Sequence, residues 1–470
     1  MMSTGTDNPG SKGLSADLLH AAVQFDGRIA MVVGAGCSLE EPTGLKLASA
    51  YSMEAHRQLV VEGVLDEGEC AAPEDLSALA SAVWQKHGRQ SPVVERLPRQ
   101  DFLMAQPNDG YLMAAALLRE RSLGAILTLN FDLAMTAALG AVGAREVTVV
   151  AGPSNTGELG AASVIYLHRN VNEVDPEKWI LRVEALAEEW QGNWEEAISH
   201  RVMTTPVVVF AGLGSPAAVL TDTVSRVRKA TDPSQHQAYV VDPAEATPFQ
   251  AALELPPEAH IRMGWSQFMS FMAERVATEL SAVLATAGEE LCTAHGWRDE
   301  AVFVRDLCER LYALGLVTTG KVRATWLLDR SAYARDDDRR ALVVDLLLAI
   351  GIVERTVGRE ARFLPDGLVE LPQPAGQAAV FLPVSGGGTL RWAALEPRVH
   401  AAIGRITPSG SVRKILVGGV QGVRPEDMAP PEDVVAGDVE FDIVRGAPGL
   451  DFVTVDEIRA DPSLGERLVG

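Results

Sequence analysis

The sequence predicts an α/β protein built on a doubly wound parallel sheet. Short apolar runs recur between residues 25 and 280, and longer segments with helical character separate them. Strands of a parallel sheet are buried on both faces, so they read as continuous apolar runs rather than as alternating patterns. Strands that alternate with helices in this way favour parallel strands joined by helical crossovers.

The first elements are a helix, a strand and a turn of small residues. We expect a short amphipathic helix over Leu14–Val23 and a buried strand over Ile29–Val33, followed at once by the turn Gly34–Ala35–Gly36–Cys37–Ser38 and a helix-like segment. Such a turn lets the backbone approach a phosphate, and the next helix aims free N–H groups at the anion. The dinucleotide fingerprint GxGxxG is not met, because Leu39 occupies the position of its third glycine. A tight turn without a ligand therefore stays an alternative.

The rest of the first domain alternates helices with strands. Residues 45–120 read as mostly helical, with loop-like patches at 67–75 and 106–110. Further strands are expected within the segments 125–139, 146–150, 164–170, 205–220 and 237–243, and a helix over 261–272 closes the domain. Several of these strands end in residues that carry chemistry, namely Asn130 and Asp132, His168, the group Gly212, Gly214 and Ser215, and Asp242.

The second part of the chain has a different pattern. Helices are expected over 299–315 and 339–351, then a hairpin around Val357–Gly358–Arg359, which together resemble a small winged-helix unit. Residues beyond 376 turn β-rich, with Gly386–Gly388 as a hairpin loop. The segment 315–321 approaches a Walker A loop, but Val322 replaces the required Ser or Thr, so we exclude ATP hydrolysis there. The expected domains are an N-terminal tail and helix (1–24), the α/β domain (25–285), a helical region (286–375) and a β-rich, α+β-type end (376–470).

Four motifs, in this order, resemble the sirtuin-like NAD-binding family. Its GAGxS turn, TxNxD strand end, LHG histidine and late G-x-S turn read here as GAGCS at 34–38, TLNFD at 128–132, LHR at 167–169 and GLGS at 212–215. The resemblance covers about residues 25–280 and departs from the family at Arg169, where the family has glycine. It implies a Rossmann-like sheet whose helical insertion forms a lid over the NAD pocket, at about residues 67–110.

The resemblance also implies roles for single residues. Asn130 would hold the ribose and the catalytic water, Asp132 would contact the carboxamide, and His168 would act as general base, for which an imidazole that titrates near neutrality is suited. Phosphate and ribose contacts are implied for Gly34, Ala35, Gly36, Ser38, Gly212, Gly214 and Ser215, and Asp242 ends a strand where a carboxylate can bind a ribose hydroxyl. From spacing alone, Asn130 and Asp132 could instead cap the next helix, and His168 could be structural.

Composition limits the classes of partner. The 41 basic and 63 acidic residues give a net charge of −22, which disfavours nucleic-acid and anionic-membrane binding. No apolar run approaches the roughly 20 residues of a membrane span, and the polar start lacks a signal peptide, so we expect a cytoplasmic protein. The four cysteines form no C-x₂-C pair, so no zinc site is expected, whereas deacetylating sirtuins typically carry a zinc module.

These features together predict a function. The absence of paired cysteines points to the zinc-free, NAD-cleaving branch of the family found in bacterial anti-phage defence. We therefore expect an NAD glycohydrolase that uses NAD as its substrate and no metal, acts as an NAD-depleting effector, forms a homo-oligomer and answers to a phage trigger or a defence partner. The alternatives are a non-catalytic module that senses NAD or ADP-ribose, and a protein deacylase or ADP-ribosyltransferase.

Overall fold

The chain divides into two compact units, residues 1–276 and 277–470, and each is described by itself. The computed structural model describes residues 14–144, 147–160, 162–182, 194–214, 218–230, 236–325, 339–363, 369–371, 379–381, 384–385, 412–418, 450–454, 461 and 463. The division falls inside the long helix α12 (Trp265–His295), as does the boundary at 285 that the sequence suggested.

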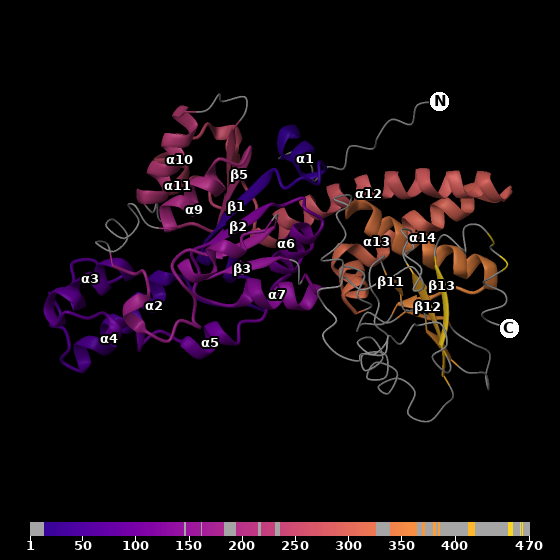
Figure 1. Ribbon diagram of the computed structural model, residues 1–470. Helices are drawn as coiled ribbons and strands as arrows, with labels where there is room; N and C mark the ends of the chain where they lie inside the picture. Colours follow the sequence, from indigo (N-terminus) through magenta and orange to yellow (C-terminus); the bar gives the residue numbers. More distant parts are fainter. Residues whose placement is uncertain are drawn as a thin grey trace. The chain divides into compact units, whose positions relative to one another are not determined.

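A seven-stranded parallel sheet forms the centre of the first unit (Figure 1). Its strands are β1 (Ile29–Val33), β2 (Ala125–Thr128), β3 (Thr148–Val150), β4 (Ser163–Tyr166), β5 (Val207–Ala211), β6 (Gln237–Val241) and β7 (His260–Ile261). The strand order β3-β4-β2-β1-β5-β6-β7 confirms the predicted doubly wound, Rossmann-like sheet. The order reverses between β1 and β5, and open sheets of this class bind ligands in the crevice at such a point.

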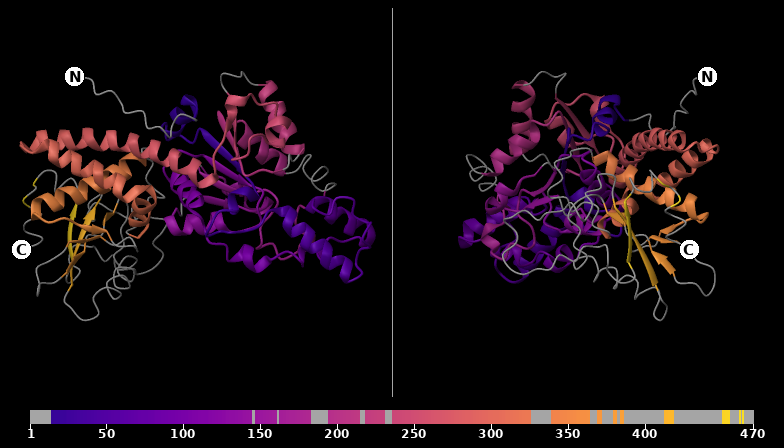
Figure 2. Two further views of the ribbon diagram at one scale, coloured as in Figure 1. Left: turned by 180° about the vertical axis from the view of Figure 1, so that it is seen from behind. Right: turned by 45° about the vertical axis from the view of Figure 1, so that its right-hand side comes forward.

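Helices cover both faces of this sheet (Figures 1 and 2). Helices α6 (Asp109–Arg119) and α7 (Ala134–Val142) pack together on one face, and α9 (Trp194–Met203) packs with α10 (Ala218–Ala230) on the other. The first unit also contains the helices α1 (Ala16–Ala22), α11 (Pro248–Ala252) and the start of α12. Its short 3₁₀ helices include η3 (Pro153–Glu158), η4 (Pro176–Lys178) and η5 (Pro257–Ala259). Right-handed crossovers require helices on both faces, because the chain moves along the sheet in one direction from β1 to β3 and in the opposite direction from β3 to β7.

The predicted helical insertion between β1 and β2 is present. It contains α2 (Ala48–Val61), α3 (Leu76–His87), α4 (Ser91–Val94) and α5 (Arg99–Leu103), which gather away from the sheet in Figure 1. Its own apolar core includes Leu59, Leu79, Val83 and Val93. The helix-like segment expected after the glycine turn begins as a short 3₁₀ helix, η2 (Ala35–Ser38), and a loop with Pro42 and with Gly44 at φ +56° separates it from α2.

The second unit combines helices with a mixed sheet, coloured orange to yellow in Figure 2. It contains most of α12, then α13 (Glu300–Thr325) and α14 (Arg339–Val357), which pack against each other. The described strands are β8 (Arg362–Phe363), β9 (Val369–Leu371), β10 (Ala379–Phe381), β11 (Val384–Ser385), β12 (Val412–Gly418) and β13 (Leu450–Thr454). In the described part of the chain, no helix is long and apolar enough to cross a membrane.

One expectation for this unit is corrected. The hairpin around Val357–Gly358–Arg359 is wrong, because α14 continues to Val357 and ends at Gly358, whose left-handed φ of +66° stops the helix. The antiparallel pair is instead β8 with β9, further along the chain. The Walker-like segment 315–321 lies within α13, so it forms no phosphate loop. The loop expected at Gly386–Gly388 lies outside the described residues.

Candidate active site

The register of the sheet brings the predicted strand-end residues to one edge. Val33 of β1, Thr128 of β2 and Tyr166 of β4 lie level with one another. Asn130 and His168 each follow two residues later, so both lie at the carboxyl edge of adjacent strands. This is the edge at which ligands bind in open α/β sheets.

Four side chains at this edge form one buried hydrogen-bond network. The Ser38 hydroxyl donates to Oδ2 of Asp132 at 2.9 Å and lies 2.8 Å from the hydroxyl of Tyr111. Nδ2 of Asn130 lies 3.1 Å from the Gly34 carbonyl oxygen, 3.2 Å from the Ser38 hydroxyl and 3.1 Å from the Tyr111 hydroxyl. Ser38 and Tyr111 are each 1% exposed, Asp132 6% and Asn130 8%. We call Ser38, Tyr111, Asn130 and Asp132 the polar network below.

The capping interpretation holds for one atom of Asp132 only. Its Oδ1 accepts from the backbone N–H of Ala134 at the start of α7, while its Oδ2 accepts from Ser38. Burial raises the pKa of Asp132, although the N–H of Ala134 and the Ser38 hydroxyl counteract this. Asp132 therefore joins the polar network to the next helix, and Asn130 is not a cap, because its side chain turns back to the β1 turn.

The glycines of the two turns pack directly on each other. The N–H of Gly36 donates to the Gly212 carbonyl oxygen at 2.9 Å, and that of Gly34 donates to the Ala211 carbonyl oxygen at 3.0 Å. A Cβ on Gly36 would lie 2.7 Å from Cα of Gly212, and one on Gly212 would lie 2.5 Å from the backbone nitrogen of Cys37. Close approach of backbone to backbone thus accounts for these glycines without a phosphate. The turns lie at the switch point between β1 and β5.

His168 lies in an aromatic environment. Its ring is 6.5 Å from that of Phe131, which stacks on Trp179 at 4.7 Å. Burial, and after it the positive charge of Arg169, lowers the pKa of His168 to about 4. This lowered pKa differs from the near-neutral titration on which the general-base role of His168 was expected to rest. His168 is neutral at pH 7, and it is a weak base in the described conformation.

A titration of His168 should show this shift directly. Because its pKa is lowered, its neutral form should persist as the pH falls from 7.5 to 5, and half-protonation should come near pH 4 rather than near the ordinary value of about 6.5. The measurement is NMR of ¹³C-labelled histidine rings, with His168→Gln to assign the resonance. A midpoint between pH 6 and 7 would contradict the described environment.

Arg169 keeps the backbone form that a glycine would adopt. Its φ is +73°, which costs a non-glycine residue roughly 1–2 kcal/mol. Its guanidinium forms an ion pair with Glu195 of α9, from Nη1 to Oε1 at 3.0 Å, and Glu195 is buried. Arg169 therefore occupies a turn of the kind that favours glycine, and its side chain ties the end of β4 to α9.

Arg169→Gly should lower the free energy of unfolding by about 2 kcal/mol, because the loss of a buried charge partner outweighs the relief of backbone strain. The measurement is urea unfolding of the full chain. The double variant Arg169→Gly/Glu195→Gln should recover most of the loss, since it leaves no unpaired carboxylate. A single variant as stable as the wild type would show that the ion pair contributes nothing.

Two other predicted cofactor residues, Asp242 and Gly214, share no described hydrogen bond with the polar network. Asp242 follows β6, and its Oδ1 accepts from the N–H of Ala244, so it forms a turn of its own. Gly214 is exposed, and a Cβ there would meet open space. Ala35 begins η2. Ser215 lies outside the described residues. The structure thus brings together the turn after β1 and the turn at Gly212. No described hydrogen bond joins Asp242 or Gly214 to these turns.

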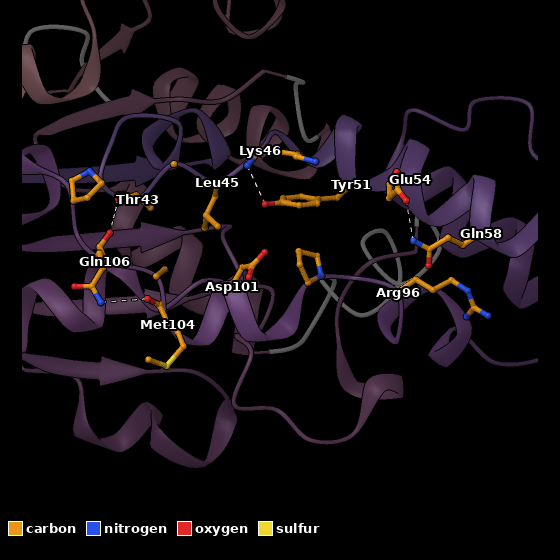
Figure 3. Close-up of a pocket in the computed structure, with 14 residues that line it drawn as sticks. Thr43, Leu45, Lys46, Tyr51, Glu54, Gln58, Arg96, Asp101, Met104 and Gln106 are labelled. Atoms are coloured by element: carbon orange, nitrogen blue, oxygen red, sulfur yellow. Dashed lines mark hydrogen bonds between the residues drawn. The ribbon is translucent and has the colours of Figure 1, made fainter.

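A pocket of about 520 Å³ is present in the first unit (Figure 3). Its walls come from the loop after Ser38 and from the helical insertion, and they include Thr43, Leu45, Lys46, Tyr51, Asp101 and Gln106. The N–H of Leu45 donates to the carbonyl oxygen of Ser38. Thr43 accepts from the N–H of Asn108, whose side chain in turn caps the N–H of Tyr111. The pocket has the size of a small-molecule site, but the predicted catalytic residues do not line it.

Sequence reasoning missed Tyr111, the ring stack of Phe131 on Trp179, and Glu195. One local signal for Tyr111 was available, because Asn108 is a good N-cap and predicts a helix start that places Tyr111 in the first turn. The partners of the other residues are 26 or more positions away in the chain, as for Arg169 with Glu195. No local pattern predicts such pairs.

The cysteines and the metal-ligating side chains show no assembled site in the described residues. Burial raises the pKa of the Cys37 thiol, which disfavours the reactive thiolate form. Within the described ranges, no group of three or more His, Cys, Asp or Glu side chains is placed to hold a metal ion.

Comparison with known proteins gives similarity to solved structures alone. No family model matches the chain, and no curated protein matches it. A Sir2 homologue mutant in complex with ADP-ribose is 18% identical, with a TM-score of 0.32, over 57% of this chain and 98% of that one. A complex of Sir2 with a p53 peptide and NAD⁺ is 18% identical, with a TM-score of 0.32, over 55% of this chain and 95% of that one. The fold assignment rests on the sheet topology given above.

Proposed function

We propose that this chain is an NAD glycohydrolase, which cleaves NAD to nicotinamide and ADP-ribose. The observation that supports this most is the meeting of Ser38, Asn130 and Asp132 in one hydrogen-bonded group at the sheet edge that also carries His168. These residues come from the motifs whose order resembles the sirtuin-like family. Residues that merely capped helices or ended strands would not need to share hydrogen bonds across 90 or more positions of chain.

The chemistry needs little more than positioning. Cleavage of the nicotinamide–ribose bond passes through an oxocarbenium-like state, so the enzyme must hold the ribose, orient the carboxamide and place a water. In this proposal Asn130 accepts from the ribose or the water, Asp132 binds the carboxamide, and neutral His168 accepts a hydrogen bond from a ribose hydroxyl. With a pKa of about 4, His168 acts in the proposal mainly by orienting the hydroxyl.

The biological role in this proposal is depletion of NAD during phage infection. The resemblance to the zinc-free defence branch supports it, and a self-killing activity must be silent in a healthy cell. We assign the restraint, and assembly of a homo-oligomer, to residues 286–470, which carry no catalytic motif. A phage trigger or a defence partner would release it.

A second candidate is a non-catalytic module that binds NAD or ADP-ribose. Two observations favour it: the amide hydrogens of Asn130 are already used within the protein, and His168 is a weak base. A sensing module needs binding without turnover, and a rigid polar network is compatible with that.

The test is to incubate the full chain with NAD and to quantify nicotinamide and ADP-ribose by chromatography. Purified protein and phage-infected cells are both assayed, because a restrained enzyme can be silent when pure. Wild type should consume NAD in at least one setting, and His168→Ala in neither. Binding of NAD without nicotinamide release in either setting would favour the sensing module. Release that requires an acetyl-lysine peptide would favour a deacylase.

A further inference from the structure

Tyr111 is a buried phenol in the middle of the polar network, and none of the motifs includes it. It lies in the first turn of α6, where Asn108 caps its backbone N–H. Its ring meets that of Trp265 edge-on at 5.7 Å, which holds it in place. Burial raises the pKa of Tyr111 well above its ordinary range, so the hydroxyl keeps its proton at every usable pH.

The chemistry of the partners fixes the direction of each hydrogen bond. The single hydroxyl hydrogen of Ser38 goes to Asp132, so Tyr111 must donate to Ser38. The Gly34 carbonyl oxygen can only accept, so the nitrogen of the Asn130 amide, not its oxygen, faces the β1 turn. Tyr111 has given its own hydrogen to Ser38, and it therefore accepts from Asn130. The hydrogen bonds run from Asn130 through Tyr111 and Ser38 to Asp132.

These hydrogen-bond directions leave one polar atom of the Asn130 side chain to bind a ligand. An amide nitrogen has two hydrogens, and both are directed to Gly34, Ser38 and Tyr111. The carbonyl oxygen Oδ1 is the remaining polar atom, and it can only accept. A ribose hydroxyl or a water is the kind of group that donates to such an oxygen.

We propose that Tyr111 is a positioning residue, whose hydroxyl holds the Asn130 amide so that Oδ1 accepts from the substrate. The inference rests on the proposed NAD hydrolysis and adds to it a residue that acts through Asn130. The side chain itself does not touch the reacting atoms. Its removal should impair the oriented, reactive complex more than it impairs substrate binding.

The experiment compares two matched variants in the full chain. Tyr111→Phe removes the hydroxyl in the polar network. Tyr166→Phe removes an equally buried hydroxyl that bonds to Thr136 at 2.8 Å, outside the network. Tyr111→Phe should lower kcat roughly 10- to 100-fold and change KM less than about threefold, whereas Tyr166→Phe should leave kcat within about twofold. Equal losses of kcat in the two variants would overturn the proposal.

A second measurement does not depend on turnover. Melting temperatures are recorded for Tyr111→Phe, Asn130→Ala and the double variant. The decrease in the double variant should be well below the sum of the two single decreases, because both changes remove the same hydrogen bond between Asn130 and Tyr111. Shifts that add would show that Tyr111 does not act through Asn130, whatever the kinetics. If the wild type cleaves no NAD, the proposed hydrolysis fails. Whether Tyr111 positions the Asn130 amide is then judged from the melting temperatures of the single and double variants alone.

Discussion

Asn130→Ala and His168→Ala should each abolish NAD hydrolysis while the fold stays intact. Both residues lie at the carboxyl edge of adjacent parallel strands, where the proposal has them bind the ribose and the water. Loss of such a group typically costs about 10²–10⁴ in rate. The measurement is nicotinamide release by activated full-length protein, with circular dichroism to verify folding.

The control is His236→Ala. His236 is also buried and also has a lowered pKa, but its Nε2 lies 2.6 Å from the Met203 carbonyl oxygen, before β6 and away from the polar network. This variant should keep turnover, even where it loses stability. Wild-type rates in His168→Ala under activating conditions would show that the catalytic assignment is wrong. Equal losses in the two histidine variants would indicate a structural effect.

The parallel, doubly wound class of the sheet could be predicted from local sequence. Apolar runs such as Ile29–Val33 predict strands because both faces are buried, and parallel pairing then brings the residues after each strand to one edge. That step needs no knowledge of side-chain packing. The expectation that Asn130 and His168 serve one site came from the resemblance to the sirtuin-like family, and the register of the sheet places both at this edge.

The chemistry of the site did not follow in the same way. The low pKa of His168 depends on its burial beside Phe131 and Trp179, and the direction of the Asn130 amide depends on a carbonyl oxygen 96 residues earlier. Such properties depend on tertiary packing. The hairpin expected at Val357 failed for a different reason, because a glycine with positive φ suits the end of a helix as well as a turn.

The glycines of the two turns give the second large prediction. Gly212→Ala should lower the free energy of unfolding by about 3–5 kcal/mol, because φ is +65° there and the new Cβ would meet the backbone nitrogen of Cys37 at 2.5 Å. Gly36→Ala should cost a similar amount, since its Cβ would meet Cα of Gly212 at 2.7 Å. The measurement is denaturant unfolding of the full chain without NAD.

The control for this prediction is Gly140→Ala in α7. A Cβ there has nothing within 4 Å, so the change should stabilise the helix by up to about 1 kcal/mol. The comparison also separates two reasons for a glycine at a strand end. A glycine needed for a phosphate would, when replaced, weaken NAD binding and leave the ligand-free protein stable. If Gly212→Ala matches Gly140→Ala in stability and impairs only NAD binding, the turns exist for the ligand, and their packing against each other is incidental.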